Sequence, residues 1–129
     1  MDTIGDFLTR IRNAHSARHE KVDIPASNMR KGIADVLQTS NYIDSYKVVK
    51  DGKQGMMRVY LKYQDSSQPA IEKVKRVSRP SRRMYVKSGE IPNIRAGYGL
   101  AILSTSRGVM SGGQAKKQNL GGELLCMVW

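Results

Sequence analysis

An apolar run that leads directly into three hydroxyl side chains is the feature that most constrains this chain. Residues 100–103 are apolar, residues 104–106 read Ser-Thr-Ser, and Arg107 and Gly108 follow. An apolar run beside turn signals predicts a buried strand. Hydroxyls at its end could serve phosphate, ribose or base edges, while the arginine adds charge and the glycine permits close approach. The alternative is a turn from strand to helix whose hydroxyls satisfy local backbone groups.

The charge of the chain is concentrated in its second part. The formal net charge of the 129 residues is +11. Residues 1–72 carry 11 Lys and Arg against 9 Asp and Glu, whereas residues 73–129 carry 11 against 2. The first part is therefore typical of an ordinary mixed-charge domain, and the second is typical of a surface that binds polyanions. Binding to acidic membranes usually needs a basic amphipathic helix, and the basic part lacks that pattern.

The first part has the pattern of two helices and a small sheet. Apolar residues at helical spacing predict a helix over 2–15, with Arg12 on or near its polar face. The other expected elements are a strand over 22–25, a second helix capped by Ser27 or Asn28, strands over 43–50 and 56–63 with a hairpin at Asp51-Gly52, a polar loop over 64–69, and a third strand of this sheet over 70–77.

The boundary between the two parts is expected at a basic linker, residues 78–83, which separates subdomain 1–77 from subdomain 84–129. Proline and two serines break the periodicity there, and three arginines crowd the segment. The remaining elements are predicted as a short strand over 84–87, a turn over 88–92, the strand that begins at Leu100, a weak helix over 111–118 and a last strand over 123–129 that packs against 100–103.

The predicted fold class is α+β, with two small subdomains. The N-terminal one is α-β-α followed by a small antiparallel sheet, and the C-terminal one is mostly β with one short helix. The helix over 111–118 is expected to be weak because Gly112 and Gly113 each cost about 1 kcal/mol relative to alanine.

No catalytic constellation or cofactor motif is present in the sequence. The basic part has only Glu90 and Glu123 as acids, and both histidines lie within the first 20 residues without a third metal ligand nearby. The single cysteine, Cys126, lies in an apolar segment and is expected to be a buried thiol. We therefore expect no enzyme activity, no metal and no cofactor.

Nucleic-acid binding has a physical basis in the second part. Arg79, Arg82 and Arg83 can each make bidentate contacts with phosphate, and Tyr85 just beyond them could stack on a base or sugar. Two alternatives remain open at this point. One is an enzyme that uses the loop of residues 104–108 as a cradle for phosphate, and the other is general binding to DNA with strong salt dependence.

Four segments, in order along the whole chain, resemble bacterial-type small-subunit ribosomal protein number eight, a universal ribosomal protein family. They are residues 8–14, 76–80 and 104–110, and the Gly121-Gly122-Glu123 run before the apolar C-terminal strand. The resemblance implies a structural component of the small ribosomal subunit. It would bind the central domain of the ribosomal RNA directly and help to assemble the platform. In some members the protein also represses translation of its own operon messenger.

The resemblance also implies the site. The hydroxyls of residues 104–106 would bond to RNA in a minor groove, Gly108 would allow close approach, and Tyr85 and Glu123 would frame the same surface. The RNA-binding residues expected from the residues and the resemblance together are Ser104, Thr105, Ser106, Arg107, Gly108, Tyr85, Glu123, Arg79, Arg82, Arg83 and Arg12.

The expected partners are ribosomal RNA and neighbouring small-subunit proteins. Number five is the first candidate, and numbers twelve and seventeen are further ones. We expect no membrane association, since the longest uncharged apolar run is far shorter than the roughly 18–20 residues that span a bilayer. We also expect no homo-oligomer. The first six residues carry two acids and no base, so we expect neither a secretory signal nor a transit peptide. The expected location is the cytoplasm, in the ribosome; a copy encoded in a plastid would look the same.

Overall fold

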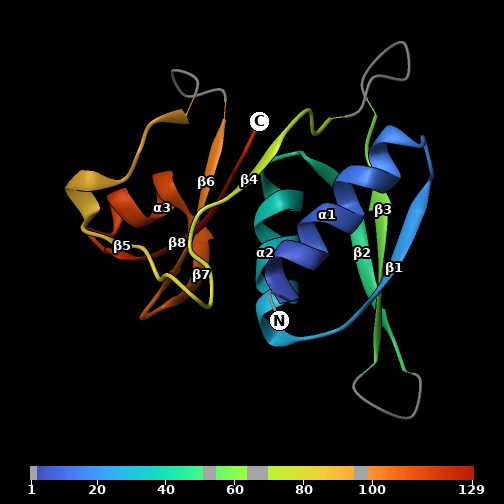
Figure 1. Cartoon of the computed structure of the whole chain (residues 1–129), viewed down its shortest axis with the longest axis horizontal. Coiled ribbons are helices and arrows are strands. Elements are labelled where there is room, and N and C mark those ends of the chain that lie inside the picture. The colour runs from blue at the N-terminus through green and yellow to red at the C-terminus, as the bar shows by residue number, and fades with distance from the viewer. Residues whose placement is uncertain (1–2, 51–54, 64–69, 95–98) are drawn as a thin grey trace. The chain divides into compact units, whose positions relative to one another are not determined.

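The protein is an α+β chain in two compact units, residues 3–72 and residues 73–129 (Figure 1). The structure, a computed structural model, describes residues 3–50, 55–63, 70–94 and 99–129. The elements in chain order are α1 (Thr3–Ser16), β1 (Lys21–Pro25), α2 (Asn28–Thr39), β2 (Ile43–Val49), β3 (Met56–Leu61), β4 (Val74–Arg76), β5 (Tyr85–Val86), the 3-10 helix η2 (Ser88–Glu90), β6 (Leu100–Thr105), β7 (Gly108–Ser111), α3 (Gly112–Lys117) and β8 (Gly122–Val128). This confirms the predicted fold class. The predicted turn at Asp51-Gly52 and the loop over 64–69 lie outside the described residues.

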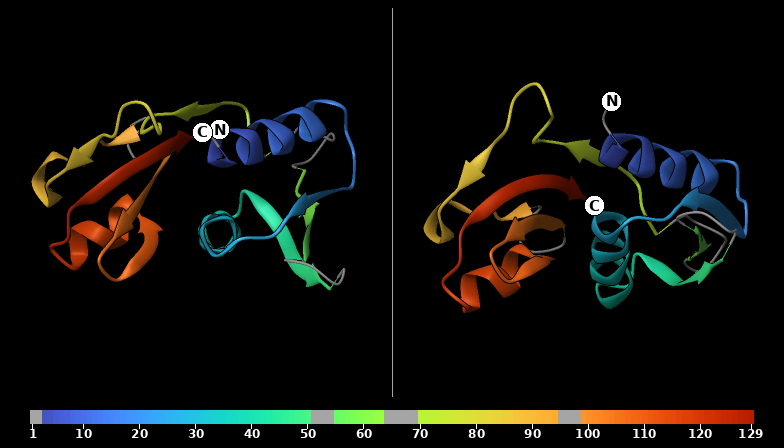
Figure 2. Two further views of the ribbon diagram at one scale, coloured as in Figure 1. Left: turned by 60° about the horizontal axis from the view of Figure 1, so that its bottom comes forward. Right: turned by 90° about the horizontal axis from the view of Figure 1, so that it is seen from below.

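In the unit of residues 3–72, two helices cover one face of an antiparallel sheet with strand order β1-β3-β2 (Figures 1 and 2). Helix α1 forms because its apolar residues recur at helical spacing, and Phe7 and Ile11 on that stripe are fully buried. Helix α2 begins after a cap at Ser27, one of the two predicted cap residues, whose hydroxyl accepts a hydrogen bond from the Arg30 backbone N–H at 3.1 Å. The pattern of β3 buries alternate residues against these helices.

The prediction that residues 70–77 form the third strand of this sheet is wrong. The third strand is β1, which pairs with β3 along all five of its residues. Strand β4 instead pairs with β8 in the other unit, where Val74 lies opposite Val128. Local sequence could not decide this, because the irregular apolar spacing of residues 70–77 fits the edge of either sheet, and β8 is a buried strand that needs partners for its backbone groups.

The unit of residues 73–129 is a sheet with strand order β4-β8-β6-β7, in which β5 also pairs with β8. The predicted pairing of the C-terminal strand with residues 100–103 is confirmed. Strand β7 was not predicted. It folds back on β6 as a hairpin, and only then does the chain enter α3. The core beneath α3 contains Ile91, Ala101, Leu103, Met110, Ala115 and Leu124.

Helix α3 forms despite its two glycines. Its N-terminus is capped by Ser111, whose hydroxyl accepts a hydrogen bond from the Gln114 backbone N–H at 3.1 Å. Gly112 is buried, and a Cβ there would lie 2.9 Å from Ile91 Cγ2 and 3.2 Å from Ala101 Cβ. Close packing of α3 on the sheet thus accounts for Gly112, whereas a Cβ on Gly113 would meet nothing.

Candidate nucleic-acid interface

Pairing across three strands brings Tyr85, Glu123 and Ser104 into one row. Tyr85 on β5 lies opposite Glu123 on β8, and Glu123 lies opposite Ser104 on β6. Residues directly opposite each other in an antiparallel sheet project from the same face. The Tyr85 side chain is 70% exposed at one end of the row, which leaves its ring accessible.

The hydroxyl cluster lies at the predicted end of a strand, and the turn after it leads into β7 rather than into a helix. Strand β6 continues through Thr105, and Ser106 and Arg107 form the turn before β7. The Thr105 hydroxyl accepts a hydrogen bond from the Arg107 backbone N–H at 3.1 Å and donates one to the Gly108 carbonyl at 2.8 Å. Thr105 therefore holds the turn in place, as the local alternative predicted for hydroxyls of this type.

Ser104 and Ser106 differ from Thr105 in that neither hydroxyl bonds to another described residue. Ser106 is exposed at the turn and Ser104 is half-buried in the row. Gly108, which follows the turn, has φ +107°, a conformation that disfavours any side chain. A Cβ at Gly108 would meet no protein atom, so the surface in front of the hairpin is open.

Glu123 is a fixed carboxylate at the centre of the row. The Ser78 hydroxyl donates to its Oε2, and Arg83 Nη1 donates to the same oxygen at 2.9 Å. Burial raises the pKa of Glu123, but the bonds from Ser78 and Arg83 and the positive charges of Arg83 and Arg76 outweigh burial and hold the pKa below its usual value. The carboxylate is thereby held in one orientation and kept charged.

The segment of residues 78–83 is fastened to the sheet by this carboxylate. Ser78 is fully buried, and its hydroxyl also accepts from the Met84 backbone N–H at 3.1 Å. Arg79 and Arg82 exchange two backbone hydrogen bonds of 3.0 Å, which closes a tight turn with both side chains exposed. Arg83 is half exposed, so it can still meet a ligand while paired with Glu123.

The paired glycines let β8 approach its neighbours closely enough to form the row. A Cβ on Gly121 would clash with the Val86 carbonyl oxygen, and a Cβ on Gly122 would clash with that of Ser104. No larger residue fits between these backbones without a shift of the strands.

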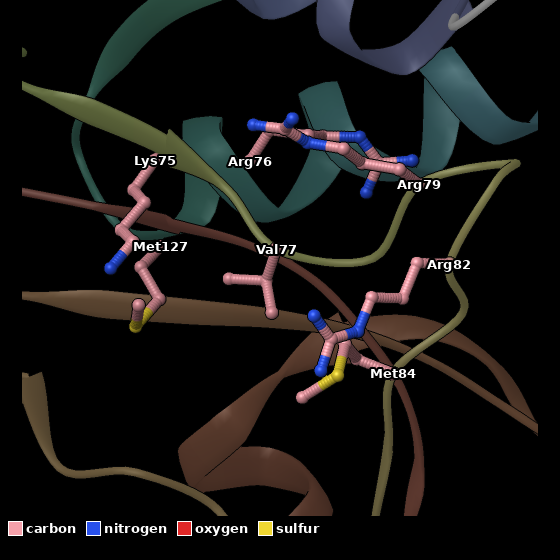
Figure 3. A pocket seen from close by; sticks show the side chains of 7 residues that line it. All are labelled: Lys75, Arg76, Val77, Arg79, Arg82, Met84 and Met127. Atoms are coloured by element: carbon pink, nitrogen blue, oxygen red, sulfur yellow. The ribbon is translucent and has the colours of Figure 1, made fainter.

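A pocket of about 370 Å³ opens beside this segment, and we call it the cationic pocket (Figure 3). Its charged lining residues are Lys75, Arg76, Arg79 and Arg82. Its apolar lining residues are Val77, Met84 and Met127. All seven belong to the unit of residues 73–129.

The structure thus gathers ten of the eleven expected site residues in one unit. Arg12 is exposed on α1 and belongs to the unit of residues 3–72. Sequence reasoning missed Ser78 as a partner of Glu123, and it missed the pocket residues Lys75, Arg76, Val77, Met84 and Met127. Contacts between segments distant in the chain, such as the pairing of β4 with β8, bring these residues into the site.

No group of three or more His, Cys, Asp or Glu is placed to hold a metal ion among the described residues. None of the helices in the described ranges is long and apolar enough to cross a membrane. Cys126 is buried as predicted, and burial raises the pKa of its thiol to about 12.

Comparison with known proteins gives a consistent result. The family model described as ribosomal protein S8 matches residues 2–129. A protein of Bdellovibrio bacteriovorus named small ribosomal subunit protein uS8 is 60% identical over 129 residues, covering 100% of both chains. Proteins of the same name from Geobacter sulfurreducens and Geotalea uraniireducens are 52% and 51% identical over 128 residues, covering 99% of this chain and 97% of theirs.

Proposed function

The chain belongs to the ribosomal protein S8 family, and from this membership we propose that it is a structural, non-catalytic component of the small ribosomal subunit. It binds the central domain of small-subunit ribosomal RNA directly and helps to assemble the platform. Residues 84–129, together with the basic segment 78–83, carry the specific contact. The protein acts in the cytoplasm, within the ribosome.

The observation that carries this proposal is the row of Tyr85, Glu123 and Ser104 that leads to the hairpin turn. An exposed ring, a fixed carboxylate and open hydroxyls lie together on a face flanked by arginines. Uncharged donors and acceptors suit the minor groove of RNA, where ribose 2′-hydroxyls and base edges are displayed, and the ring suits an unstacked base. The arginines add phosphate contacts that fix orientation.

Within this face the hydroxyls have different roles. Ser104 and Ser106 bond to RNA, because their hydroxyls have no bond to another described residue. Thr105 positions the turn through its two local bonds. Arg79, Arg82, Arg83 and Arg107 contact phosphates, and Glu123 orients Arg83 while it accepts hydrogen bonds from the ligand.

A binding titration tests the proposal. The full chain should bind a central-domain fragment of small-subunit ribosomal RNA at least about a thousandfold more tightly than an unrelated RNA duplex of the same length, as specific complexes do. Equal affinity for the two RNAs would contradict specific binding and would indicate that the chain binds polyanions in general. Equal affinity for duplex DNA of that length would favour the DNA alternative.

We also propose two finer roles. The chain represses its own operon messenger by binding a segment that resembles the ribosomal site, so central-domain RNA and that messenger should compete for one site. It also contacts neighbouring small-subunit proteins, of which number five, number twelve and number seventeen are the candidates. Crosslinking in assembled subunits, followed by mass spectrometry, tests these contacts.

A further inference from the structure

The cationic pocket lies at the sheet edge next to the proposed RNA-binding face. In the sheet order β4 is the outer strand, and Lys75 lies opposite Met127 on β8. Met127 pairs with Ala101 on β6, so the two side chains project from the same face. Because side chains alternate along a strand, this face is opposite to the one that carries Ile102 and Ser104. The part of the pocket lined by Lys75 and Met127 thus belongs to the other face from the row of Tyr85, Glu123 and Ser104.

The pocket nevertheless extends around the edge toward that row. Arg76 lines it too, and Arg76 pairs with Cys126, which in turn pairs with Ile102 on the face that carries Ser104. The charge of Arg76 acts on Glu123 and helps to lower its pKa. The row ends at Tyr85 on β5, and β4 pairs with the same edge of β8 further along, so a strand of RNA that follows this edge from the row toward β4 would meet the pocket next.

The lining of the pocket combines charge with apolar surface. Four side chains are cations and three are apolar, and neither Asp nor Glu is among them. A phosphate diester suits guanidinium and ammonium groups, and the face of a base suits methionine and valine surface. A volume of about 370 Å³ falls within the range of small-molecule sites and is large enough for one base with its sugar.

We propose that the cationic pocket binds one unpaired nucleotide of RNA, with the base against Met84 and Met127 and the flanking phosphates on Lys75, Arg79 and Arg82. This inference rests on the proposed RNA-binding function and adds a second contact to it, on single-stranded rather than helical RNA. An acidic peptide would match the charge, but it offers neither a planar apolar ring nor phosphates in regular spacing. Continuity with the RNA-binding face therefore favours RNA.

The test uses the full chain and fluorescein-labelled octauridylate, measured by fluorescence anisotropy. The double variant Lys75→Gln/Arg82→Gln removes two exposed charges from the pocket and should weaken binding by roughly tenfold, with a smaller salt dependence, because two phosphate contacts are lost. The matched control Lys116→Gln/Lys117→Gln removes two exposed charges from α3, outside the pocket, and should leave the affinity within about twofold of the parent. Equal losses in the two double variants would overturn the proposal in favour of a net-charge effect.

A crosslinking arm tests the position of the base. Octauridylate with a single 4-thiouridine, irradiated in complex with the chain, should crosslink to Met84 or Met127. Crosslinks confined to Tyr85 would overturn the assignment, as would stronger binding of an octaglutamate peptide than of octauridylate. Ser106→Ala separates the two proposals, since it should weaken central-domain RNA binding without changing the affinity for octauridylate. If Ser106→Ala left central-domain RNA binding unchanged while Lys75→Gln/Arg82→Gln weakened octauridylate binding, only the proposed hydroxyl contact would be refuted. If Ser106→Ala weakened central-domain RNA binding while Lys75→Gln/Arg82→Gln left octauridylate binding unchanged, only the inference about the cationic pocket would be refuted.

Discussion

The backbones of Gly122 and Ser104 lie in direct contact across β8 and β6. A Cβ on Gly122 would clash with the Ser104 carbonyl oxygen and would lie only 3.0 Å from the Ser104 carbonyl carbon. This approach brings the next residue, Glu123, opposite both Ser104 and Tyr85. The glycine pair is thus what allows a carboxylate, a hydroxyl and an aromatic ring to share one face.

Gly122→Ala should therefore destabilise the unit of residues 73–129 by about 1–3 kcal/mol, since a methyl group must push two rigid backbones apart. The only tryptophan, Trp129, lies in this unit, so urea unfolding followed by tryptophan fluorescence reports on it. RNA affinity should fall as well, because the row loses its register. An unchanged unfolding midpoint would show that β8 can shift without a loss of stability. The close contact between Gly122 and Ser104 would then not be needed to keep the row in register.

Gly113→Ala is the opposite case. A Cβ there meets nothing, and alanine is a better helix former than glycine, so this variant should stabilise the same unit by roughly 0.5 kcal/mol. Gly112→Ala should not gain stability, because its Cβ would press on Ile91 and Ala101. The same fluorescence measurement compares the two. Equal effects at the two glycines would contradict the packing argument for Gly112.

Glu123 should make the unit of residues 73–129 sensitive to acid. The pKa of Glu123 in the folded chain lies below its usual value of 4.5, so its stabilising contribution is complete above that pH and is lost as the pH falls through the lower folded value. Glu123→Gln should therefore lower the urea midpoint at about pH 7, with a difference from the parent that shrinks at about pH 3. A difference that does not change with pH would mean that the variant acts through packing alone.

Protonation of His15 should lower the stability of the other unit, residues 3–72, and should do so at a higher pH. It is fully buried, its Nε2 donates to the Lys62 carbonyl at 3.1 Å, and its ring meets Tyr63 edge-on. Burial lowers the pKa of His15 below 6.5 and outweighs the hydrogen bond to Lys62, which raises it. The unfolded chain then binds a proton more readily than the folded one, so stability declines as the pH falls below 6.5.

Thermal unfolding by circular dichroism tests this, because α1 and α2 hold most of the helical residues. Between about pH 7.5 and pH 5.5 the melting temperature of the parent should fall, and that of His15→Phe should fall much less. His19→Ala, at an exposed histidine, is the matched control and should behave like the parent. If the melting temperature of His15→Phe fell as much as that of the parent, a group other than His15 would have to cause the pH dependence.

Much of this fold follows from local pattern. The spacing of Phe7 and Ile11 predicts α1, Ser27 predicts the start of α2, and the apolar residues of β6 and β8 predict their burial. The partner of residues 74–76 could not be predicted, because strand pairing depends on contacts between distant segments. Strand β7 was missed because it has only four residues and one buried side chain, which is too short for an alternation of apolar and polar residues to be recognised.

The residue types of the proposed site can be read from the sequence, but the geometry that joins them cannot. Hydroxyls, arginines and an aromatic residue in a basic region indicate RNA binding. The division between Thr105, which bonds within the turn, and Ser106, which does not, depends on a hairpin that the sequence did not reveal. The bond between Ser78 and Glu123 joins residues 45 apart in the chain, so it too depends on the folded sheet.

The central claim is that uncharged hydroxyls on the β6–β7 hairpin select the RNA. Equilibrium binding of the chain to the central-domain RNA fragment, measured for Ser106→Ala over a range of salt concentrations, tests it most directly. Ser45→Ala, a serine in β2 of the other unit, is the matched control. We predict that Ser106→Ala weakens binding by roughly tenfold with an unchanged salt slope, because it removes a hydrogen bond and no charge. Affinity equal to that of the parent and of Ser45→Ala would contradict the claim.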